Sequence, residues 1–311
     1  MTASSGSGEG QKAPPGGGPA SHPGRLRRVL KWLLIPLQIY LGVAAVFFFL
    51  QTRLIFPGSD TQGDAGSTIQ APPGTELLHL KTSQGERVVA LFGRALNPDG
   101  STRPDASTRP TLLYFYGNAM CLSEASHEFD EFRRLGFHVM IPDYLGYGMS
   151  GGKPSEVGCR ETAETSFSYL TTRPDVDRGR IVVAGWSLGG AVAIDLASRH
   201  DVAGVATFCT FTRLADMARR IVPFLPVSLL LRHRFENLAK IAKVGCPVLI
   251  GHGRRDQIIP FSMADRLAGA VQGPVSRVTI DDADHNDFFA VGGREVRSAL
   301  SRFVEDLPRR P

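Results

Sequence analysis

A short motif at residues 185–189, GWSLG, constrains the fold of this chain more than any other feature. It follows an apolar run at 181–184 that is typical of a buried strand, and it precedes a helix-like run at 191–197. Glycines on both sides of Ser187 would let a strand and a helix approach without a Cβ clash, with the serine held in a strained turn. This arrangement indicates a nucleophile elbow, provided that the chain also supplies a base, an acid and an oxyanion hole.

Strand patterns and helix patterns alternate along most of the chain. Apolar or alternating runs predict strands at 77–80, 87–92, 111–116, 138–142, 181–184, 204–209, 246–251 and 275–281. Helix patterns occupy 123–135, about 155–172, 191–197, 261–271 and roughly 293–305. The alternation predicts an α/β fold with a mostly parallel central sheet, helices on both faces and functional loops at the carboxyl ends of the strands. A turn-rich insert at 97–110 is predicted to be a surface loop.

Composition divides the 311 residues into four segments. Residues 1–28 are rich in Gly, Ser, Pro and Ala, which predicts a disordered tail because such a segment buries too little apolar surface. Residues 29–52 are predicted to form a transmembrane anchor, and residues 53–70 a linker rich in Gly, Pro and Ser. Residues 71–308 carry the strand and helix patterns and are predicted to form one α/β domain, with a short cap insertion at about 210–244.

The anchor prediction rests on an uncharged stretch of 19 residues, from Trp32 to Leu50. As a helix it would be roughly 28 Å long, which is enough to cross the hydrocarbon core of a bilayer. A buried core helix would be amphipathic, whereas this stretch is apolar all round. A cleaved signal peptide would have a shorter apolar core, and the candidate cleavage site at 43–45 is followed by the unsuitable run VFFF. We therefore favour an uncleaved N-terminal transmembrane helix.

The basic residues are concentrated beside this stretch. Arg25, Arg27, Arg28 and Lys31 precede it, and Arg53 follows it. By the positive-inside rule, the N-terminus of this single-pass protein is expected in the cytoplasm and the α/β domain on the non-cytoplasmic side. Most of the formal net charge of +5 lies in the first 60 residues, so the folded part is near neutral. This distribution argues against a nucleic-acid partner and for a membrane contact through the N-terminal helix.

Two later strands each end in a residue that could assist Ser187. Asp256 follows the strand at 246–251, and His285 follows the strand at 275–281. The order serine, acid, histidine is the one that a nucleophile elbow on such a sheet requires. His285 would take the proton from the serine hydroxyl, and Asp256 would fix the imidazole tautomer and stabilise its charged form.

Other carboxylates near His285 are weaker candidates for the acid. Asp281, Asp282, Asp284 and Asp287 lie too close to His285 in the sequence to come from a separate strand end. Asp287 is expected to cap a short turn instead.

The oxyanion hole requires two backbone N–H groups directed at the developing negative charge. One is expected from Leu188, the residue after the nucleophile. The second is expected from the loop that follows the strand at 111–116. Within that loop, Asn118 is our first choice and Ala119 the second.

The remaining cysteines and histidines do not indicate a metal site or a cofactor. The four cysteines form no C-x-x-C motif, and we expect them to be buried free thiols. Cys209 and Cys246 are predicted at opposite ends of the sheet, too far apart for a disulfide. Among the histidines other than His285 there is no metal-type pair, and His252, which could lie near the site, is expected to have a structural role. We expect neither a cofactor nor a metal.

Five short motifs occur in a characteristic order: YGNA (116–119), YLGYGMS (144–150), GWSLGG (185–190), HGRRD (252–256) and DHND (284–287). With these motifs and its N-terminal anchor, the chain resembles the membrane-anchored α/β-hydrolase-domain serine hydrolases, a lipase-, esterase- and thioesterase-like family. The resemblance covers about residues 50–306. Two positions depart from the family pattern: Tyr116 replaces a histidine, and Asp284 replaces a glycine. Neither change removes a catalytic atom, although the first could alter substrate access.

The resemblance implies an α/β-hydrolase fold and hydrolysis of lipid esters, acyl thioesters or related small-molecule acyl substrates. A membrane-tethered hydrolase of carboxylic esters or thioesters, acting through an acyl-enzyme on Ser187, is therefore the favoured function. A peptidase or amidase with the same triad stays open, because substrate pockets lie in loops. A non-catalytic scaffold is less favoured, since Ser187, Asp256 and His285 are all present.

Segment 210–244 lies where this fold inserts a lid, and its stretch at 221–231 is strongly apolar. Arginines flank that stretch on both sides: Arg219, Arg220, Arg232 and Arg234. One interpretation is a cap that binds an acyl chain or touches the membrane. The other is a set of helices that simply packs on the edge of the sheet.

Overall fold

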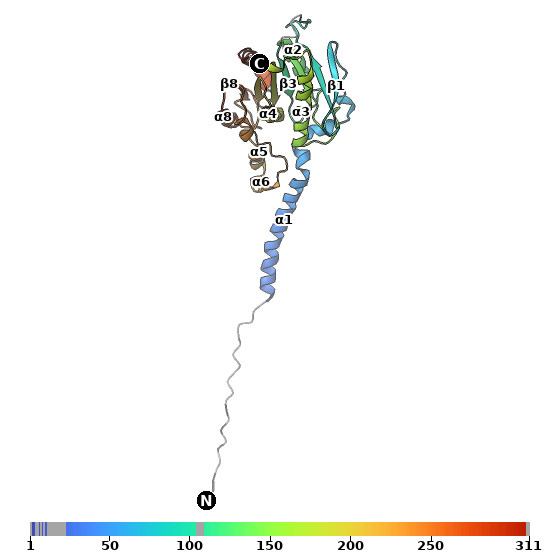
Figure 1. Ribbon diagram of the computed structural model, residues 1–311. Helices are drawn as coiled ribbons and strands as arrows, with labels where there is room; N and C mark the ends of the chain where they lie inside the picture. Colours follow the sequence, from blue (N-terminus) through green and yellow to red (C-terminus); the bar gives the residue numbers. More distant parts are fainter. Residues whose placement is uncertain are drawn as a thin grey trace. The chain divides into compact units, whose positions relative to one another are not determined.

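The structure, a computed structural model, describes residues 2, 3, 6, 8, 10, 23–103 and 109–308 (Figure 1). It consists of two compact units, Met1–Phe47 and Phe48–Pro311, which are considered separately below. Much of the predicted tail at 1–28 lies outside the described residues, as do residues 104–108 of the predicted surface loop.

The second unit is built on an eight-stranded sheet with the order β1-β2-β4-β3-β5-β6-β7-β8. The strands are β1 (Thr75–Lys81), β2 (Arg87–Gly93), β3 (Thr111–Phe115), β4 (His138–Pro142), β5 (Ile181–Trp186), β6 (Gly204–Phe208), β7 (Val248–Gly253) and β8 (Val275–Ile280). β2 pairs antiparallel with both β1 and β4, whereas every neighbouring pair from β4 to β8 is parallel. The predicted α/β-hydrolase fold with a mostly parallel sheet is confirmed.

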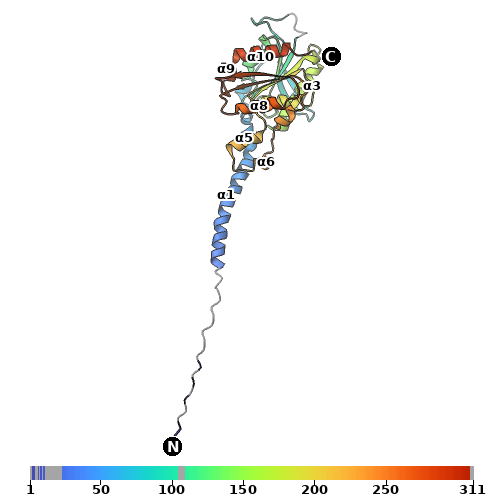
Figure 2. The ribbon, with the colours of Figure 1, turned by 90° about the vertical axis from the view of Figure 1, so that its left-hand side faces the viewer.

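Helices cover both faces of this sheet, as Figures 1 and 2 show. α2 (Ser126–Arg134) and α10 (Gly293–Glu305) lie on one face, where Arg297 pairs with Glu131 at 3.0 Å. The other face carries α3 (Glu156–Thr172), α4 (Leu188–Ala197) and α8 (Phe261–Ala270). Because both faces are covered, the central strands are buried along their whole length, which explains their mostly apolar sequences.

Three short helices connect β6 to β7 in the predicted cap segment. They are α5 (Leu214–Ile221), α6 (Val227–Leu230) and α7 (Asn237–Ile241). α7 packs on the domain, with Asn237 and Ile241 buried, whereas α5 and α6 expose several large apolar side chains. α7 therefore fits the interpretation as a helix that packs on the sheet region, whereas an acyl-binding or membrane-contacting role of α5 and α6 stays a prediction.

The N-terminal helix α1 runs from Pro23 to Ile55. Within it, Leu34–Ile55 is 22 residues long with a mean hydropathy of 1.9. Among the described residues this is the one helix that is long and apolar enough to cross a membrane, a criterion of length and composition alone.

The residues that directly follow α1 pack against the α/β domain. Two short 3₁₀ helices, η1 (Pro57–Thr61) and η2 (Ala65–Ser67), occupy the predicted linker. Phe56 is fully buried, and the Gly58 N–H donates a hydrogen bond to the Asn118 carbonyl at 2.9 Å. The predicted linker is therefore part of the packed domain around the Asn118 loop.

All four cysteines are buried and free, as predicted. Cys209 directly follows β6, and Cys246 lies just before β7. Because β6 and β7 are parallel, these two residues lie at opposite ends of the sheet.

Candidate active site

Ser187 occupies a strained turn between β5 and α4. Its φ of 55° and ψ of −115° lie in a region that residues with a side chain rarely adopt. The turn is held by two hydrogen bonds: the Ser187 N–H donates to the Phe208 carbonyl at 2.8 Å, and Thr210 Oγ1 donates to the Ser187 carbonyl at 2.7 Å. The side chain is thereby fixed at the carboxyl end of the sheet, where this fold places its reactive groups.

The glycines of the motif are required by close packing. A Cβ atom on Gly189 would lie 1.8 Å from the Phe115 carbonyl oxygen, and one on Gly185 would lie 2.2 Å from the Gly189 backbone. Both contacts are far shorter than a van der Waals distance. The absence of side chains at these two positions lets α4 begin directly against β3 and β5.

The structure brings His285 and Asp256 to Ser187, as the order of the strands predicted. His285 Nε2 lies 3.1 Å from Ser187 Oγ, and His285 Nδ1 lies 2.8 Å from Asp256 Oδ2. All three side chains are buried. This series of contacts allows a proton to pass from the serine hydroxyl to the imidazole while the carboxylate stabilises the resulting charge.

Asp256 is held in its ionised form by several donors. Its Oδ1 accepts hydrogen bonds from the backbone N–H groups of Ile258 at 3.0 Å and Ile259 at 2.7 Å. Burial alone would raise the pKa of the Asp256 carboxyl, but contacts with His252 and His285 outweigh burial and hold its pKa well below the ordinary value. Asp256 is therefore ionised at neutral pH, as it must be to stabilise the positively charged imidazolium of His285.

His252 also lies beside this carboxylate. Its Nε2 atom is 2.9 Å from the Ile259 carbonyl oxygen and 3.2 Å from Asp256 Oδ2. The sequence placed His252 near the site with a structural role, and these contacts describe a side chain that supports the Asp256 loop.

Cys209 is a neighbour that the sequence did not indicate. Its thiol, the Asp256 carboxylate and the His285 ring offer potential ligand atoms within 4.8 Å of one another. Burial raises the pKa of the Cys209 thiol well above its ordinary value, so the sulfur stays protonated, whereas metals bind the thiolate. Since Asp256 also holds His285 directly, the chemistry of this donor set fits a metal poorly.

Asp284 connects the loops of the acid and the base. Its Oδ1 accepts hydrogen bonds from the backbone N–H groups of Gln257 at 2.8 Å and His285 at 2.7 Å. Asp287 precedes the short helix α9 (Phe288–Val291), but its carboxylate accepts a hydrogen bond from the Asp284 N–H at 2.7 Å rather than capping the helix. The Asp287 side chain therefore does not cap α9, contrary to the expectation from the sequence that it caps a short turn.

The loop with the predicted oxyanion residue is fixed from three sides. The Asn118 carbonyl accepts hydrogen bonds from Gly58 N–H at 2.9 Å and Tyr147 Oη at 3.0 Å, and Asn118 Nδ2 donates to the Ile55 carbonyl at 3.1 Å. The Asn118 N–H forms no hydrogen bond within the described part of the chain. Leu188 is the first residue of α4, so its N–H has no acceptor inside the helix.

Tyr116, which replaces a histidine of the family pattern, belongs to a buried polar network beneath this loop. Its hydroxyl donates to Asp143 Oδ1 at 2.8 Å. The Asp143 carboxylate also accepts from the N–H groups of Leu122 at 2.7 Å and Met149 at 2.9 Å. Burial raises the pKa of Asp143 to about 6, although these hydrogen bonds oppose the effect. Tyr116 thus contributes to the support of the loop.

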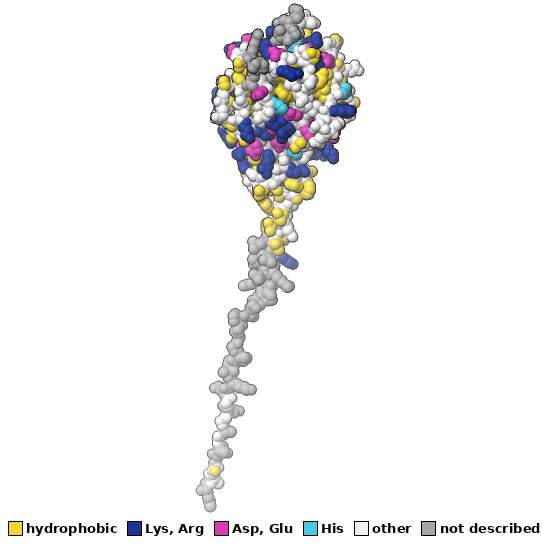
Figure 3. All heavy atoms as spheres, in the orientation of Figure 1, with side chains coloured by type: hydrophobic (Ala, Val, Ile, Leu, Met, Phe, Trp, Pro, Cys, Tyr) yellow, Lys and Arg dark blue, Asp and Glu magenta, His cyan; other side chains and the backbone are white. Residues whose placement is uncertain are grey.

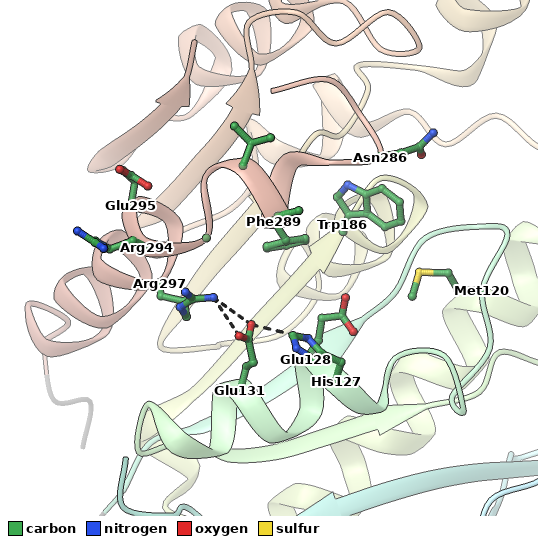
Figure 4. Close-up of a pocket in the computed structure, with 13 residues that line it drawn as sticks. Met120, His127, Glu128, Glu131, Trp186, Asn286, Phe289, Arg294, Glu295 and Arg297 are labelled. Carbon is green, nitrogen blue, oxygen red and sulfur yellow. Dashed lines mark hydrogen bonds and ion pairs between the residues drawn. The ribbon is translucent and has the colours of Figure 1, made fainter. Parts of the chain in front are cut away.

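A pocket of about 740 Å³ lies beside the loops that carry the nucleophile and the base (Figure 4). Trp186, Met120 and Phe289 supply apolar surface, and the Trp186 ring lies 5.1 Å from the His285 ring. Charged side chains from α2 and α10 line the rest, where Arg297 contacts Glu131. This pocket offers binding space adjacent to Trp186, the residue before Ser187.

Comparison with known proteins places this geometry in a family. Residues 116–294, more than half of the chain, match the dienelactone hydrolase family. The chain belongs to this family. The matched region contains Ser187, Asp256, His285 and Asn118, and the predicted membership in an α/β-hydrolase serine hydrolase family is confirmed.

Two curated proteins are similar to most of this chain. An uncharacterized protein of Mycobacterium tuberculosis is 32% identical over 90% of this chain and 96% of its own length. Human alpha/beta hydrolase domain-containing protein 17B is 31% identical over 74% of this chain and 75% of its own length. Among solved structures, the Pyrococcus furiosus esterase Pf2001 superposes with a TM-score of 0.60 at 17% identity, covering 75% of this chain and 91% of the esterase. At that identity the likeness shows the fold alone.

Proposed function

We propose that this member of the family is a membrane-tethered serine hydrolase that cleaves carboxylic esters or thioesters of lipid-like acyl groups. The observation that carries the proposal is the hydrogen-bonded series Ser187 Oγ, His285 Nε2, His285 Nδ1 and Asp256 Oδ2, with separations of 3.1 Å and 2.8 Å. Membership in the dienelactone hydrolase family supports the reaction class.

In the first half of the reaction, His285 Nε2 removes the proton from Ser187 Oγ as the oxygen attacks the acyl carbonyl carbon. Asp256 stays ionised and stabilises the imidazolium that forms. When the tetrahedral intermediate collapses, the bond from carbon to the leaving oxygen or sulfur breaks, and His285 returns the proton to that atom. The product of this half is an ester between the acyl group and Ser187.

In the second half, His285 removes a proton from a water molecule that attacks the acyl-enzyme. Collapse of the second intermediate releases the carboxylic acid and restores the Ser187 hydroxyl. In both halves the negative charge on the carbonyl oxygen would be stabilised by the N–H groups of Leu188 and Asn118, or of Ala119 in place of Asn118.

The tether in this proposal is α1. The span of 22 residues at Leu34–Ile55 has the length and hydropathy of a transmembrane helix. A cluster of basic residues lies just before it (Arg25, Arg27, Arg28 and Lys31), which favours a cytoplasmic N-terminus and a hydrolase domain on the other side of a single-pass topology. Protease protection in intact cells, with epitope tags at both ends, tests this orientation; degradation of the N-terminal tag alone would reverse it.

The reaction class is tested by labelling the full-length protein with a fluorophosphonate probe. Such a probe reacts with a serine that is activated as a nucleophile, so we expect labelling of the wild type and none of Ser187→Ala. Ser198→Ala is the matched control, because Ser198 lies at the other end of α4 and its hydroxyl donates to the Asp195 carbonyl, away from the site. Equal labelling of wild type and Ser187→Ala, or an unlabelled wild type, would remove the assignment.

A panel of soluble substrates then separates ester and thioester hydrolysis from amide hydrolysis. We expect turnover of p-nitrophenyl esters and acyl thioesters that rises with apolar acyl chains. Preferential turnover of peptide amides would instead assign a peptidase, and labelling without turnover of any substrate would favour the scaffold.

A further inference from the structure

The segment that includes α5 and α6 exposes large apolar side chains. Ile221 is 74% exposed, Phe224 59% and Leu229 84%. Their neighbours Val222 and Leu225 are buried and pack inward. The segment therefore has an apolar outer surface in addition to its apolar inner surface, which is unusual for a cap that faces water on its outside.

These side chains are grouped rather than scattered. Figure 3 shows yellow side chains at the lower end of the body, where Figure 1 places α5 and α6 together with the end of α1, whose apolar side chains contribute to the same region. Exposed arginines border the apolar group on both sides in the sequence: Arg219, Arg220, Arg232 and Arg234. We call the outer side chains of residues 219–234 the cap surface.

Residues of the cap surface form hydrogen bonds with Gln51 and Thr52, near the end of the candidate span. Gln51 Nε2 donates to the Leu230 carbonyl at 3.1 Å, and the Arg232 N–H donates to Gln51 Oε1 at 2.7 Å. Gln51 is buried by these contacts. Thr52 Oγ1 lies 3.1 Å from His233 Nε2, and the Arg232 guanidinium lies 5.2 Å from the centre of the Phe48 ring. Residues 230–233 are thereby held beside residues 48–52.

This position fixes the depth of the cap surface in a bilayer. The uncharged stretch from Trp32 ends at Leu50, so residues 48–52 would lie where the hydrocarbon core meets the headgroups. Groups that are hydrogen-bonded to residues 48–52 must lie at nearly the same depth. Leu229 directly precedes the held residues and is strongly exposed, so it would meet the lipid rather than water.

We propose that the cap surface inserts into the headgroup layer of the membrane, with Ile221, Phe224 and Leu229 among the lipids. Arg220 and Arg234 can place their stems along apolar groups and their guanidinium groups on lipid phosphates, which favours an anionic phospholipid surface. The guanidinium groups of Arg219 and Arg232 contact Asp216 and Phe48 instead. The partner is thus a phospholipid bilayer, contacted by the hydrolase domain in addition to its anchor. This inference rests on the tether proposed above.

A functional consequence follows from the chain path. The cap segment begins at Thr210, whose hydroxyl donates to the carbonyl of Ser187. Insertion of the cap surface would therefore keep the turn that carries Ser187 near the bilayer, which is the source of the lipid-like acyl substrates proposed above.

The proposal is tested with the full-length protein in phospholipid vesicles. A Leu229→Cys variant is labelled with an environment-sensitive NBD probe, and selective labelling is feasible because all four native cysteines are buried. Gln272→Cys is the matched control, since Gln272 is exposed just before β8, at the amino ends of the parallel strands. Thermal melts of both variants confirm that the fold is retained, and Ile221→Cys serves as a second probe position.

We expect blue-shifted NBD emission at residue 229 and at least threefold stronger quenching by shallow nitroxide-labelled lipids than at residue 272. The effect should increase when anionic lipids are added to zwitterionic vesicles. A blue shift that requires a high ratio of protein to lipid would instead indicate a second copy of this chain on the cap surface and would overturn the proposal.

Alkaline carbonate extraction separates failure of the tether from failure of the contact. A chain that washes off the vesicles contradicts the proposed anchor, and the inference fails with it. A chain that stays in the vesicles while probes at residues 221 and 229 are quenched no more than at 272 overturns the membrane contact alone.

Discussion

The Asp284 carboxylate accepts a hydrogen bond from the backbone N–H of Gln257 at 2.8 Å, across the gap between two loops of the active site. Gln257 follows the acid Asp256, and Asp284 precedes the base His285. The same oxygen atom also accepts from the His285 N–H at 2.7 Å. One side chain therefore sets the spacing between the acid and the base, at a position where the related family pattern has a glycine.

We expect Asp284→Ala to lower kcat for a soluble ester about tenfold, because small misplacements of catalytic groups are costly. KM should change little, since Asp284 holds the catalytic loops rather than substrate. Asp284→Asn keeps an oxygen acceptor and should restore most of the rate. Asp282→Ala is the control: its carboxylate is exposed and pairs only with Arg255 on the surface. Steady-state kinetics of the three variants decide the point, and an unaffected Asp284→Ala enzyme would contradict the positioning role.

Asp256→Asn should lower kcat by about 10⁴, the loss seen when the acid of a serine protease triad is replaced in the same way. The amide can hold His285 only in the wrong tautomer, with no charge to stabilise the imidazolium. His285→Ala should abolish turnover. Asp281→Asn removes an exposed carboxylate that pairs with Arg254 and should leave the rate unchanged. Near-normal turnover by Asp256→Asn would move the acid role to another residue.

The packing of Gly189 makes a sharp prediction about stability. Gly189→Ala places a Cβ 1.8 Å from the Phe115 carbonyl oxygen in a central strand, where neither backbone can move aside. We expect a loss of about 3 kcal/mol or more in the free energy of unfolding. A Cβ on Gly269 of α8 meets no atom within 4 Å, so Gly269→Ala should instead stabilise by about 0.5–1 kcal/mol. Thermal and urea melts of both variants measure the contrast; similar effects of the two would refute the steric argument.

The raised pKa of the Asp143 carboxyl predicts that the free energy of unfolding depends on pH. Burial raises its pKa from the usual 3.8 to about 6, so the folded protein holds this proton more tightly than the unfolded chain. The contribution of the group is therefore fully present below about pH 4 and is lost as the pH rises through 6, by up to about 3 kcal/mol. Urea unfolding at pH 4.5 and pH 7 should show a smaller difference in Asp143→Asn than in the wild type, although the variant is less stable at both. An identical difference in the two proteins would exclude Asp143 as the source.

The fold could be predicted from the sequence because its signals are local. The buried parallel strand predicted at 111–116 from its apolar run matches β3 within one residue, and the alternating run predicted at 275–281 matches the edge strand β8 equally well. The strand predicted at 246–251 is shifted, since β7 runs from Val248 to Gly253. The apolar run indicates the strand, but its ends depend on pairing with β6 and β8.

The positions of the site residues were also predictable, for a topological reason. Parallel strands end at the same edge, so polar residues after β5, β7 and β8 must converge there. The contacts around them were not predictable. Asp284 appeared in the sequence only as a weaker candidate for the acid and as a departure from the family pattern, and Cys209 only as a buried thiol. Their placement beside Gln257 and Asp256 depends on how separate loops meet, which leaves no periodic signal in the sequence.

For the predicted linker, the amino-acid composition did not reveal that the segment packs on the domain. Residues 53–70 are rich in Gly, Pro and Ser, which is the composition of a flexible connection. The same residues also suit short, packed 3₁₀ turns, and these are what the structure contains. A Cβ on Gly58 would lie 2.3 Å from the Tyr147 ring, so the small residue there reflects close packing rather than flexibility. Composition alone does not distinguish these two uses of glycine.

The packing of Ile55 and Gly58 against Asn118 has a consequence for releasing the enzyme from its anchor. A chain that starts at residue 48 keeps both contacts, whereas one that starts at residue 62 loses the Ile55 carbonyl and the Gly58 N–H that hold Asn118. We expect the shorter chain to lose at least tenfold in kcat on a soluble ester, with KM less affected; equal rates would contradict this. A protease that shed the domain by cutting between residues 58 and 62 would therefore switch the enzyme off in the same event.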